Sequence, residues 1–331
     1  MQYRELGKTG IKVSAVALGC MAFVGDSTWG SQDEKDSCES IIAALDGGIT
    51  LFDTAESYGN GYSEELLGKA LQGRRSEAVI ATKVYKTHMR EGEVQKACED
   101  SLKRLKTDYI DLYQIHWPNW DVPIEETMGA LEKLRQDGKI RAIGVCNFGI
   151  KDLEGVLQAG TIVTNQLPYN LLWRVIEHEL IPKCQENNIG VICYSSLSQG
   201  LLTGVFKSAD DFPAGRARTR LFSGSRPDAK HGESGFEKEV FEALGKIDSI
   251  CQETRMSMTD IAIAWLLSQE IVTSLLASAR NAKEAIENAK SADIKLSNEI
   301  IGKLNRITED LKMKIGTNPD PWASGAQTRF R

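Results

Sequence analysis

The stretch YIDLYQIH, residues 109–116, is a nearly continuous apolar run that ends in a polar residue. Such a run is typical of a strand in a parallel sheet that helices cover on both faces, because neither face of the strand meets water. Seven further runs share this pattern: AVALGC (15–20), ITLFD (49–53), AVIATK (78–83), IRAIGVCN (140–147), TIVTNQ (161–166), GVICYSS (190–196) and VTSLLAS (272–278). The sequence therefore predicts eight short parallel strands.

Amphipathic segments alternate with these runs and are joined by short polar or glycine-containing turns. The helical patterns cover residues 35–45, 64–71, 94–105, 127–135 and 180–186. Eight β/α units without a break in composition favour one closed (β/α)8 barrel, a TIM barrel, over two domains. We therefore predict a single α/β barrel domain over residues 1–331.

Three segments fall outside this alternation. The stretch YRELGKTGIKVS, residues 3–14, predicts an N-terminal β-hairpin that would plug the bottom of the barrel. Residues from about 203 to 235 are charged, rich in glycine and serine, and too long for an ordinary connection. We interpret them as a mobile loop over the ligand face, with a disordered insertion without function as the alternative. The tail, about 315–331, contains two prolines and a tryptophan and is expected to lie on the surface.

Composition excludes several classes of function. The chain has 40 basic and 46 acidic residues, and the basic ones are scattered, so we predict no nucleic-acid partner. No apolar run approaches the roughly 20 residues that cross a bilayer, and the N-terminus has no signal-peptide pattern. We therefore expect a cytoplasmic protein without a membrane partner. The seven cysteines never form a C-x-x-C spacing, which favours reduced thiols over disulfides or a zinc site.

Polar residues end successive predicted strands. The active site of such a barrel forms at the carboxyl ends of its strands, so these residues would meet at one mouth. Each has a plainer explanation when taken singly, since an aspartate often caps a helix and a lone histidine is usually structural. Polar residues at six successive strand ends nevertheless favour a site, and they are Asp53, Lys83, His116, Asn147, Gln166 and Tyr194 with Ser195.

An aspartate, a lysine, a histidine and a nearby tyrosine suit proton transfer to a carbonyl oxygen while a hydride reaches its carbon. A tyrosine has a pKa near ~10, and a lysine ammonium beside it lowers that pKa by favouring the phenolate. Asp53 would keep Lys83 charged and oriented, and His116 would donate a hydrogen bond to the same carbonyl oxygen. The residues alone leave open which tyrosine acts.

Three other sites are excluded by spacing. Gly59 and Gly61 would start a dinucleotide fingerprint, but Glu64 stands where its third glycine belongs. No tyrosine is followed four residues later by lysine, so the signature of short-chain dehydrogenases is absent. The pair His178-Glu179 does not continue into H-E-x-x-H, and we predict no metal site.

Stretches along almost the whole chain together resemble the aldo-keto reductase family: LGKTGIKVS (6–14), DTAESYG (53–59), ATK (81–83), SLKRLKTDYIDLYQIH (101–116), GKIRAIGVCNF (138–148), NQLPYN (165–170) and YSSLSQGLLTG (194–204). The resemblance implies a barrel that binds an extended nicotinamide dinucleotide without a Rossmann domain. It also implies a catalytic tetrad of Asp53, Tyr58, Lys83 and His116. The branch that it resembles includes bacterial general-stress reductases and is related to potassium-channel β subunits.

The same resemblance implies which residues hold the cofactor. Asn147 and Gln166 would hold the nicotinamide carboxamide, and Tyr194 would stack on the nicotinamide ring. The remaining implied positions are Ser195, Leu197, Gln199 and Gly200 at the pyrophosphate, Ser278 and Arg280 at the 2'-phosphate, and Glu284, Glu287 and Asn288 around the adenine. Arg280 favours NADP(H) over NAD(H), because its fork suits a phosphate dianion.

Three departures from the family pattern affect these assignments. Cys146 replaces a usual serine before Asn147, which exchanges a good hydroxyl donor for a weak thiol. Ser278 replaces a frequent glycine, and Glu284 replaces a frequent glutamine. A carboxylate near a 2'-phosphate is repulsive, which weakens the preference for NADP(H).

The sequence thus predicts an NADP(H)-dependent oxidoreductase that reduces aldehydes or ketones to alcohols, with Tyr58 as the general acid. The alternatives are a sugar or polyol dehydrogenase that works in the oxidative direction, and a regulatory subunit that senses the dinucleotide. Candidate residues for the substrate pocket are Met21, Trp29, Tyr85 and Trp117. Their aromatic walls suit a small carbonyl compound or a sugar. The substrate and the oligomeric state stay open.

Overall fold

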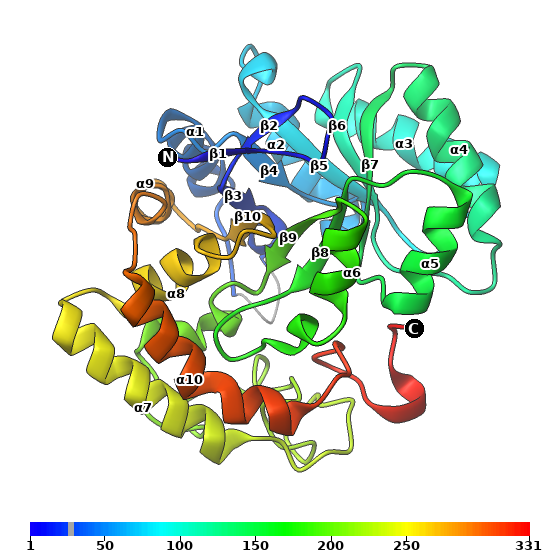
Figure 1. Ribbon diagram of the computed structural model, residues 1–331. Coiled ribbons are helices and arrows are strands. Elements are labelled where there is room, and N and C mark those ends of the chain that lie inside the picture. Colours follow the sequence, from blue (N-terminus) through cyan, green and yellow to red (C-terminus); the bar gives the residue numbers. More distant parts are fainter. Residues whose placement is uncertain (26–29) are drawn as a thin grey trace.

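A computed structural model describes residues 1–25 and 30–331. Within these residues, eight parallel strands close into a barrel in the order β10-β3-β4-β5-β6-β7-β8-β9 (Figure 1). The strands are β3 (Val16–Gly19), β4 (Leu51–Asp53), β5 (Val79–Val84), β6 (Ile110–Ile115), β7 (Ile140–Cys146), β8 (Thr164–Pro168), β9 (Gly190–Tyr194) and β10 (Val272–Ala277). The predicted (β/α)8 fold is confirmed, and each predicted strand overlaps an observed one.

Helices surround the barrel and bury the outer faces of its strands. They are α1 (Glu34–Asp46), α2 (Tyr62–Ala70), α3 (Glu91–Leu105), α4 (Ile124–Gln136), α5 (Ile150–Ala159), α6 (Leu180–Glu186), α7 (Glu237–Thr254), α8 (Met258–Leu267), α9 (Ala282–Ser291) and α10 (Asn298–Ile315). Short 3-10 turns are η1 (Met21–Val24), η2 (Tyr58–Gly61), η3 (Arg75–Glu77), η4 (Val175–Glu177), η5 (Ser198–Thr203) and η6 (Gly325–Gln327). Helices α7 and α10 pack together at one side of the barrel (Figure 1).

The N-terminal hairpin closes the bottom of the barrel, as the sequence predicts. Strands β1 (Tyr3–Glu5) and β2 (Lys12–Ser14) pair antiparallel and cross the barrel strands in dark blue in Figure 1. The hairpin residues Leu6, Ile11 and Val13 are buried in one cluster with barrel residues such as Leu51 and Leu112. Apolar burial of this kind stabilises the fold by about 25 cal/mol per Å².

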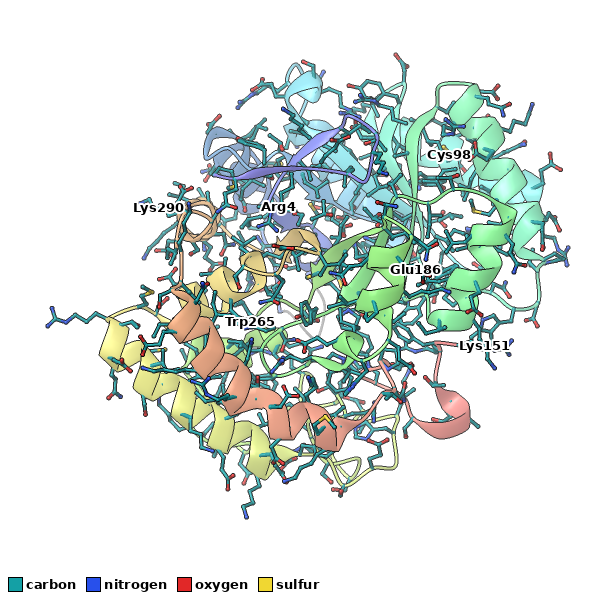
Figure 2. The ribbon with its side chains drawn as sticks, viewed as in Figure 1. Arg4, Cys98, Lys151, Glu186, Trp265 and Lys290 are labelled. Atoms are coloured by element: carbon teal, nitrogen blue, oxygen red, sulfur yellow. The ribbon has the colours of Figure 1, made fainter. Side chains whose placement is uncertain are left out.

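Arg4 fastens the hairpin to the last barrel strand. Its side chain lies beside β10 (Figure 2), where the guanidinium donates hydrogen bonds to the backbone oxygens of Leu267 (2.6 Å) and Val272. The Leu267 carbonyl lies at the end of α8, and the Val272 carbonyl lies at the start of β10. The hairpin is therefore held by polar contacts at its rim as well as by its buried apolar face.

The register of one strand differs from the prediction. The pattern TIVTNQ predicts a strand over 161–166, whereas β8 runs from Thr164 to Pro168, where Pro168 pairs with Tyr194 of β9. Helix α5 ends at Ala159, so residues 160–163 are needed for the turn back to the sheet. Gln166 therefore lies inside β8, where it pairs with Cys146 of β7, and not at the end of the strand.

The long segment between η5 and α7 packs against the tail of the chain. Phe212, Leu221 and Phe222 of this segment are buried. The guanidinium of Arg220 pairs with Glu233 at 2.9 Å and donates a hydrogen bond to the backbone oxygen of Asn318 at 2.9 Å. Loop and tail therefore form one cover beside the barrel mouth, where the sequence predicts two separate surface segments.

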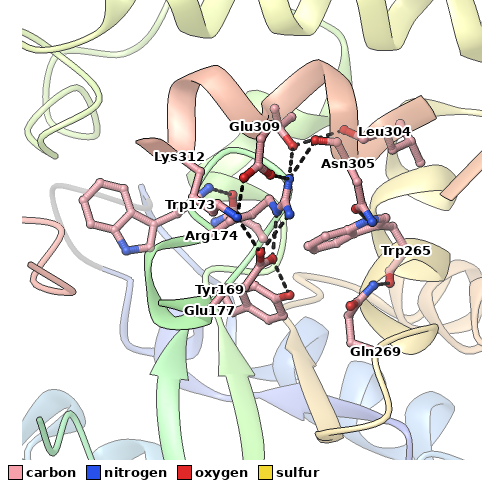
Figure 3. A network of polar contacts seen from close by, with 12 residues as sticks. Tyr169, Trp173, Arg174, Glu177, Trp265, Gln269, Leu304, Asn305, Glu309 and Lys312 are labelled. Atoms are coloured by element: carbon pink, nitrogen blue, oxygen red, sulfur yellow. Dashed lines mark hydrogen bonds and ion pairs between the residues drawn. The ribbon is translucent and has the colours of Figure 1, made fainter. Parts of the chain in front are cut away.

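A polar network ties the segment after β8 to α10 (Figure 3). Arg174 pairs with Glu177 at 2.7 Å and donates to the backbone oxygen of Asn305 at 2.8 Å. Glu177 also accepts a hydrogen bond from the Tyr169 hydroxyl at 2.8 Å. Arg174 is 6% exposed, so these contacts are poorly screened by solvent. They fix the connection that leaves β8 at the mouth of the barrel.

The described ranges, 1–25 and 30–331, contain no helix that is long and apolar enough to cross a membrane. The prediction of a single domain over 1–331 and the prediction of a cytoplasmic location stay predictions.

Candidate active site

The side chains of Asp53, Lys83 and Tyr58 meet at the carboxyl ends of β4 and β5. The Lys83 ammonium donates to Asp53 Oδ1 at 2.6 Å and to the backbone oxygen of Thr54 at 2.7 Å. It also lies 3.4 Å from the Tyr58 hydroxyl. Lys83 is fully buried and the Asp53 side chain is 3% exposed, so the pair is removed from solvent. The structure therefore brings together three of the four residues of the predicted tetrad by direct hydrogen bonds.

The loop after Tyr58 turns in the left-handed region of backbone space. Gly59, Asn60 and Gly61 have φ angles of 59°, 53° and 93° in succession. Such angles suit glycine and are tolerated by asparagine. The two glycines are thus turn residues, and they aim the phenol of Tyr58 back at Lys83 before α2 begins at Tyr62.

A buried ion pair supports this turn from outside the barrel. Glu64 is 0% exposed, and it accepts hydrogen bonds from the Arg104 guanidinium at 2.7 Å and from the Thr82 hydroxyl. The Arg104 side chain lies directly against Gly61, where a Cβ atom would collide with it. The residue that breaks the dinucleotide fingerprint therefore anchors the loop that carries Tyr58.

Burial and charge oppose each other at Tyr58. Burial raises the pKa of the Tyr58 phenol to about 12, although the Lys83 ammonium pulls it down. Burial also disfavours the charged form of Lys83, but the Asp53 carboxylate raises the pKa of that ammonium above its ordinary value. The sequence predicts a lowered phenol pKa. Lys83 acts in that direction, but the desolvation of the phenol is the larger effect. Tyr58 is therefore protonated at neutral pH.

His116 lies beside two tyrosines of the mouth, Tyr58 and Tyr85. Its ring meets the Tyr58 ring edge to face, with centroids 5.7 Å apart, and the Tyr85 ring at 5.9 Å. Burial, and then the charge of Lys83, holds the pKa of His116 well below its ordinary value. A neutral imidazole has one N–H to donate. Its Nδ1 lies 3.4 Å from the Ser57 hydroxyl, which leaves Nε2 for another partner.

Two glutamine amides hold the second oxygen of Asp53. Gln166 donates to Asp53 Oδ2 at 2.7 Å, and Gln114 donates to the same atom at 3.4 Å. The Cys146 thiol in turn donates to Gln114 Oε1 at 3.6 Å. The sequence reasoning missed Gln114, because it is the third residue from the end of its run and only the last residues were considered. In the structure, Gln114 pairs with Lys83 of the neighbouring strand. A polar residue within a buried apolar run was the signal in the sequence that could have marked Gln114 as part of the site.

Asn147 and Tyr194 are hydrogen-bonded to each other. The Tyr194 hydroxyl donates to Asn147 Oδ1 at 2.9 Å, and Asn147 Nδ2 donates to the backbone oxygen of His116 at 3.1 Å. Asn147 has a φ angle of 63°, a left-handed conformation that asparagine tolerates. Both residues therefore lie at the mouth as predicted, with Gln166 in the neighbouring strand.

The segment after β9 is strained. Ser195, Ser198 and Gln199 have φ angles of 53°, 49° and 55°, and Gly200 has a φ angle of 107°. Such angles in residues other than glycine each cost about 1–3 kcal/mol and cluster at ligand sites. The side-chain oxygen of Gln199 is buried without a hydrogen-bond partner among the described residues. The predicted residues Ser195, Leu197, Gln199 and Gly200 thus form one irregular turn.

Arg216 stands beside this turn and was missed by the sequence reasoning. Its guanidinium donates to the backbone oxygen of Gln199 at 2.9 Å and lies near the rings of Phe206 and Phe212. In the part of the chain that the structure describes, it has no ion pair, and burial lowers its pKa. It lies in an irregular loop, so no periodic pattern could have marked it.

The predicted adenosine residues gather after β10 and on α9. Asn288 donates to the backbone oxygen of Ser278 at 3.1 Å, and Glu284 accepts from the backbone N–H of Arg280 at 2.8 Å. Glu287 is exposed and lies 3.9 Å from Lys283. The Arg280 guanidinium donates to Gln32 Oε1 at 3.0 Å and to the backbone oxygen of Ser31. Its fork is therefore already engaged by the loop that precedes α1.

The predicted pocket residues are placed only in part. Tyr85 and Trp117 lie next to His116, and Met21 is 41% exposed. Trp29 lies outside the described residues. The tail adds a tryptophan to which the sequence assigns no role. The ring of Trp322 is parallel to that of Tyr194, with centroids 6.0 Å apart.

The fold and this site define a class of protein: a (β/α)8 barrel with a buried lysine–carboxylate pair, a tyrosine and a neutral histidine at its mouth. The profile of the Aldo/keto reductase family matches residues 15–309. The chain belongs to this family. The more specific resemblance to the branch of general-stress reductases and potassium-channel β subunits stays a prediction.

Individual relatives agree with this membership. The chain is 41% identical to the aldo-keto reductase YhdN of Bacillus subtilis over 281 residues, which is 81% of this chain and 82% of the relative. It is 32% identical to an NADH-specific methylglyoxal reductase of Escherichia coli, over 94% of this chain and 100% of the relative. A crystal structure of an aldo/keto reductase from Klebsiella pneumoniae with NADP and acetate has a TM-score of 0.74 and 30% identity, and the similarity covers 93% of this chain and 96% of that one.

Proposed function

We propose that this protein is an NADP(H)-dependent carbonyl reductase in which Tyr58 donates the proton to the carbonyl oxygen of an aldehyde or ketone. The observation that carries the proposal is the position of the Lys83 ammonium, 2.6 Å from Asp53 and 3.4 Å from the Tyr58 hydroxyl at the barrel mouth. A buried lysine with a paired carboxylate and a phenol beside it supports a role in proton transfer.

The residues around the mouth fit a nicotinamide dinucleotide. The amide nitrogen of Gln166 donates to Asp53, and its Oε1 can therefore accept a hydrogen bond from the carboxamide of a nicotinamide. The strained turn at Ser195 and Gln199 suits a pyrophosphate, because the Arg216 cation beside it has no ion pair among residues 1–25 and 30–331. The family membership and the NADP-bound structural relative support the same cofactor. A bound reduced nicotinamide supplies the hydride.

The protein groups then have separate tasks. Tyr58 keeps its proton until negative charge develops on the carbonyl oxygen, because burial holds its pKa at about 12. Lys83 stabilises the phenolate that remains, and Asp53 holds Lys83 in place. His116 is neutral and donates its free N–H to the same oxygen, which polarises the carbonyl. In the oxidative direction, the phenolate of Tyr58 takes the proton of the alcohol.

The two directions of the reaction are expected to differ in their pH dependence. Reduction needs the protonated phenol, whose pKa is raised to about 12. Deprotonation of Tyr58 should therefore not lower the rate of reduction between about pH 6 and 10. Oxidation needs the phenolate, so its rate should rise up to ~tenfold per pH unit over the same range. The measurement is the absorbance of the reduced nicotinamide with an aldehyde panel and an alcohol panel. Loss of reduction above about pH 8, or no turnover of any compound, would contradict the proposal.

Replacement of Arg280 tests the preference for NADP(H). Arg280→Ala is expected to raise the KM for NADPH by ~tenfold or more and the KM for NADH much less, because a charge-assisted contact to the 2'-phosphate is lost. The engagement of Arg280 by Ser31 and Gln32 reduces the effect, since those bonds must be exchanged. Lys283→Ala removes an exposed cation of the same segment and serves as the control. Equal changes in the KM values for NADPH and NADH would remove the argument that Arg280 binds the 2'-phosphate. Such a result would resemble the cofactor use of the NADH-specific relative.

A further inference from the structure

We propose that Arg329 forms an anion-binding subsite at the barrel mouth, and that the preferred substrates are aldehydes or ketones that carry a carboxylate at the end remote from the carbonyl group. This inference rests on the proposed carbonyl reduction and specifies its substrate class. It concerns the tail of the chain, to which the sequence reasoning gave no role.

The position of Arg329 is fixed by two tryptophans. Its guanidinium lies 4.0 Å from the ring centroid of Trp117 and 5.2 Å from that of Trp322. Trp117 follows His116 directly, and the Trp322 ring is parallel to that of Tyr194. Arg329 therefore stands between the wall of the mouth that carries His116 and the wall that carries Tyr194.

Aromatic and polar contacts connect Arg329 to the reacting groups. The positive charge of Arg329 opposes the rise that burial and the Asp320 carboxylate cause in the pKa of Tyr194. The Tyr194 hydroxyl donates to Asn147 Oδ1 at 2.9 Å, and Asn147 Nδ2 donates to the backbone oxygen of His116 at 3.1 Å. Arg329 lies over the Trp117 ring at 4.0 Å, and Trp117 directly follows His116, whose ring meets that of Tyr58 at 5.7 Å. A substrate of modest length is therefore expected to span Arg329 and Tyr58.

The guanidinium is held rigidly by Asp320. Arg329 Nε donates to Asp320 Oδ2 at 2.8 Å, and Arg329 NH2 donates to Oδ1 at 2.6 Å. The carboxylate also accepts from the backbone N–H groups of Trp322, Ala323 and Arg329. Asp320 is 0% exposed, so its charge is enclosed and fully hydrogen-bonded. A ligand at the mouth meets the arginine and not the aspartate.

One edge of the guanidinium stays open. Within residues 1–25 and 30–331, no hydrogen bond uses the NH1 group of Arg329, and the side chain is 39% exposed. The two tryptophan rings hold the planar guanidinium in one position, which lowers the entropy lost when an anion binds. A rigid guanidinium edge that still has free N–H donors suits a carboxylate.

A matched pair of substrates isolates the charge. We compare 4-carboxybenzaldehyde with its neutral methyl ester, and 4-oxobutanoate with its methyl ester as a flexible aliphatic pair. The wild-type protein is expected to show a kcat/KM for the acid that is ~tenfold or more above that of the ester in at least one pair, because a charge-assisted hydrogen bond is added. The preference should fall as ionic strength rises.

Variants then assign the preference to Arg329. Arg329→Met should lower kcat/KM for the acid by ~tenfold or more, mainly through KM, and should change the ester far less. Arg329→Met leaves the buried Asp320 carboxylate without its cation. The double variant Asp320→Asn/Arg329→Gln therefore provides the same test without an unpaired charge. Arg331→Met is the control, because Arg331 is also a tail arginine stacked on a tryptophan, Trp120, at 3.6 Å.

The outcomes separate this inference from the proposed function. If the ester and the acid have equal kcat/KM values in both pairs, the subsite is overturned and carbonyl reduction stays intact. An acid preference that survives in both Arg329 variants, or that Arg331→Met removes equally, overturns the assignment to Arg329. If neither acids nor esters are reduced, the proposed function and the subsite both fail.

Discussion

Replacement of Tyr58 with phenylalanine is expected to lower kcat for aldehyde reduction by about 10²- to 10⁴-fold, which is the usual contribution of a positioned general acid. The phenylalanine ring keeps the packing against His116, whose centroid lies 5.7 Å away, and removes only the hydroxyl. The Kd for NADPH should stay within about twofold, since the loss concerns proton transfer and not binding.

A neighbouring tyrosine provides the control for this variant. Tyr62 lies at the start of α2, is 37% exposed, and donates its hydroxyl to Glu34 at 3.2 Å, away from Lys83. Tyr62→Phe should leave kcat within about twofold, because surface substitutions of this kind have small effects. Substantial turnover by Tyr58→Phe, with cofactor binding intact, would show that another group supplies the proton.

Replacement of Lys83 with methionine should damage both stability and activity. Lys83 is fully buried, and its loss leaves the Asp53 carboxylate without its cation. Breaking a buried ion pair on one side typically costs about 3–5 kcal/mol in the free energy of unfolding. The variant should also lose ~100-fold or more in kcat, because the phenolate of Tyr58 is no longer stabilised.

A double variant separates these two effects. Asp53→Asn/Lys83→Met removes both charges, and its free energy of unfolding, from denaturant titration, should recover most of the loss seen in Lys83→Met. Its kcat should stay as low as that of the single variant. A double variant as unstable as Lys83→Met would mean that the cost is a packing defect. Recovery of kcat together with stability would mean that Lys83 serves only the fold.

The barrel was predictable because its signal is local and repeated. Each strand is a short apolar run, and the geometry of a closed parallel barrel then brings Asp53, Lys83 and His116 together without further information. Spacing also excluded the dinucleotide fingerprint at Gly61 and Glu64. The placement of these residues follows from the sequence, while the roles of the predicted site residues stay predictions until the variants are measured.

The parts that were not predicted depend on contacts between distant segments. Arg216 lies in an irregular loop, and Trp322 and Arg329 lie in a tail without periodicity, so their positions at the mouth are set by tertiary packing. The pKa of Tyr58 depends on how deeply the phenol is buried, and this depth cannot be read from residue types. A neighbouring lysine was visible in the sequence, but the larger opposing effect of desolvation was not.

The contact between Gly61 and Arg104 links the outside of the molecule to its chemistry. Any side chain at position 61 would displace Arg104 from Glu64, and a carboxylate with no exposed surface would lose its cation. The Arg104–Glu64 pair joins α3 to α2, which begins directly after the turn that presents Tyr58. The outer ring of helices and the turn that carries Tyr58 are therefore coupled through this ion pair. Reshaping this loop for a new substrate should therefore preserve the Arg104–Glu64 pair, or replace both of its members together.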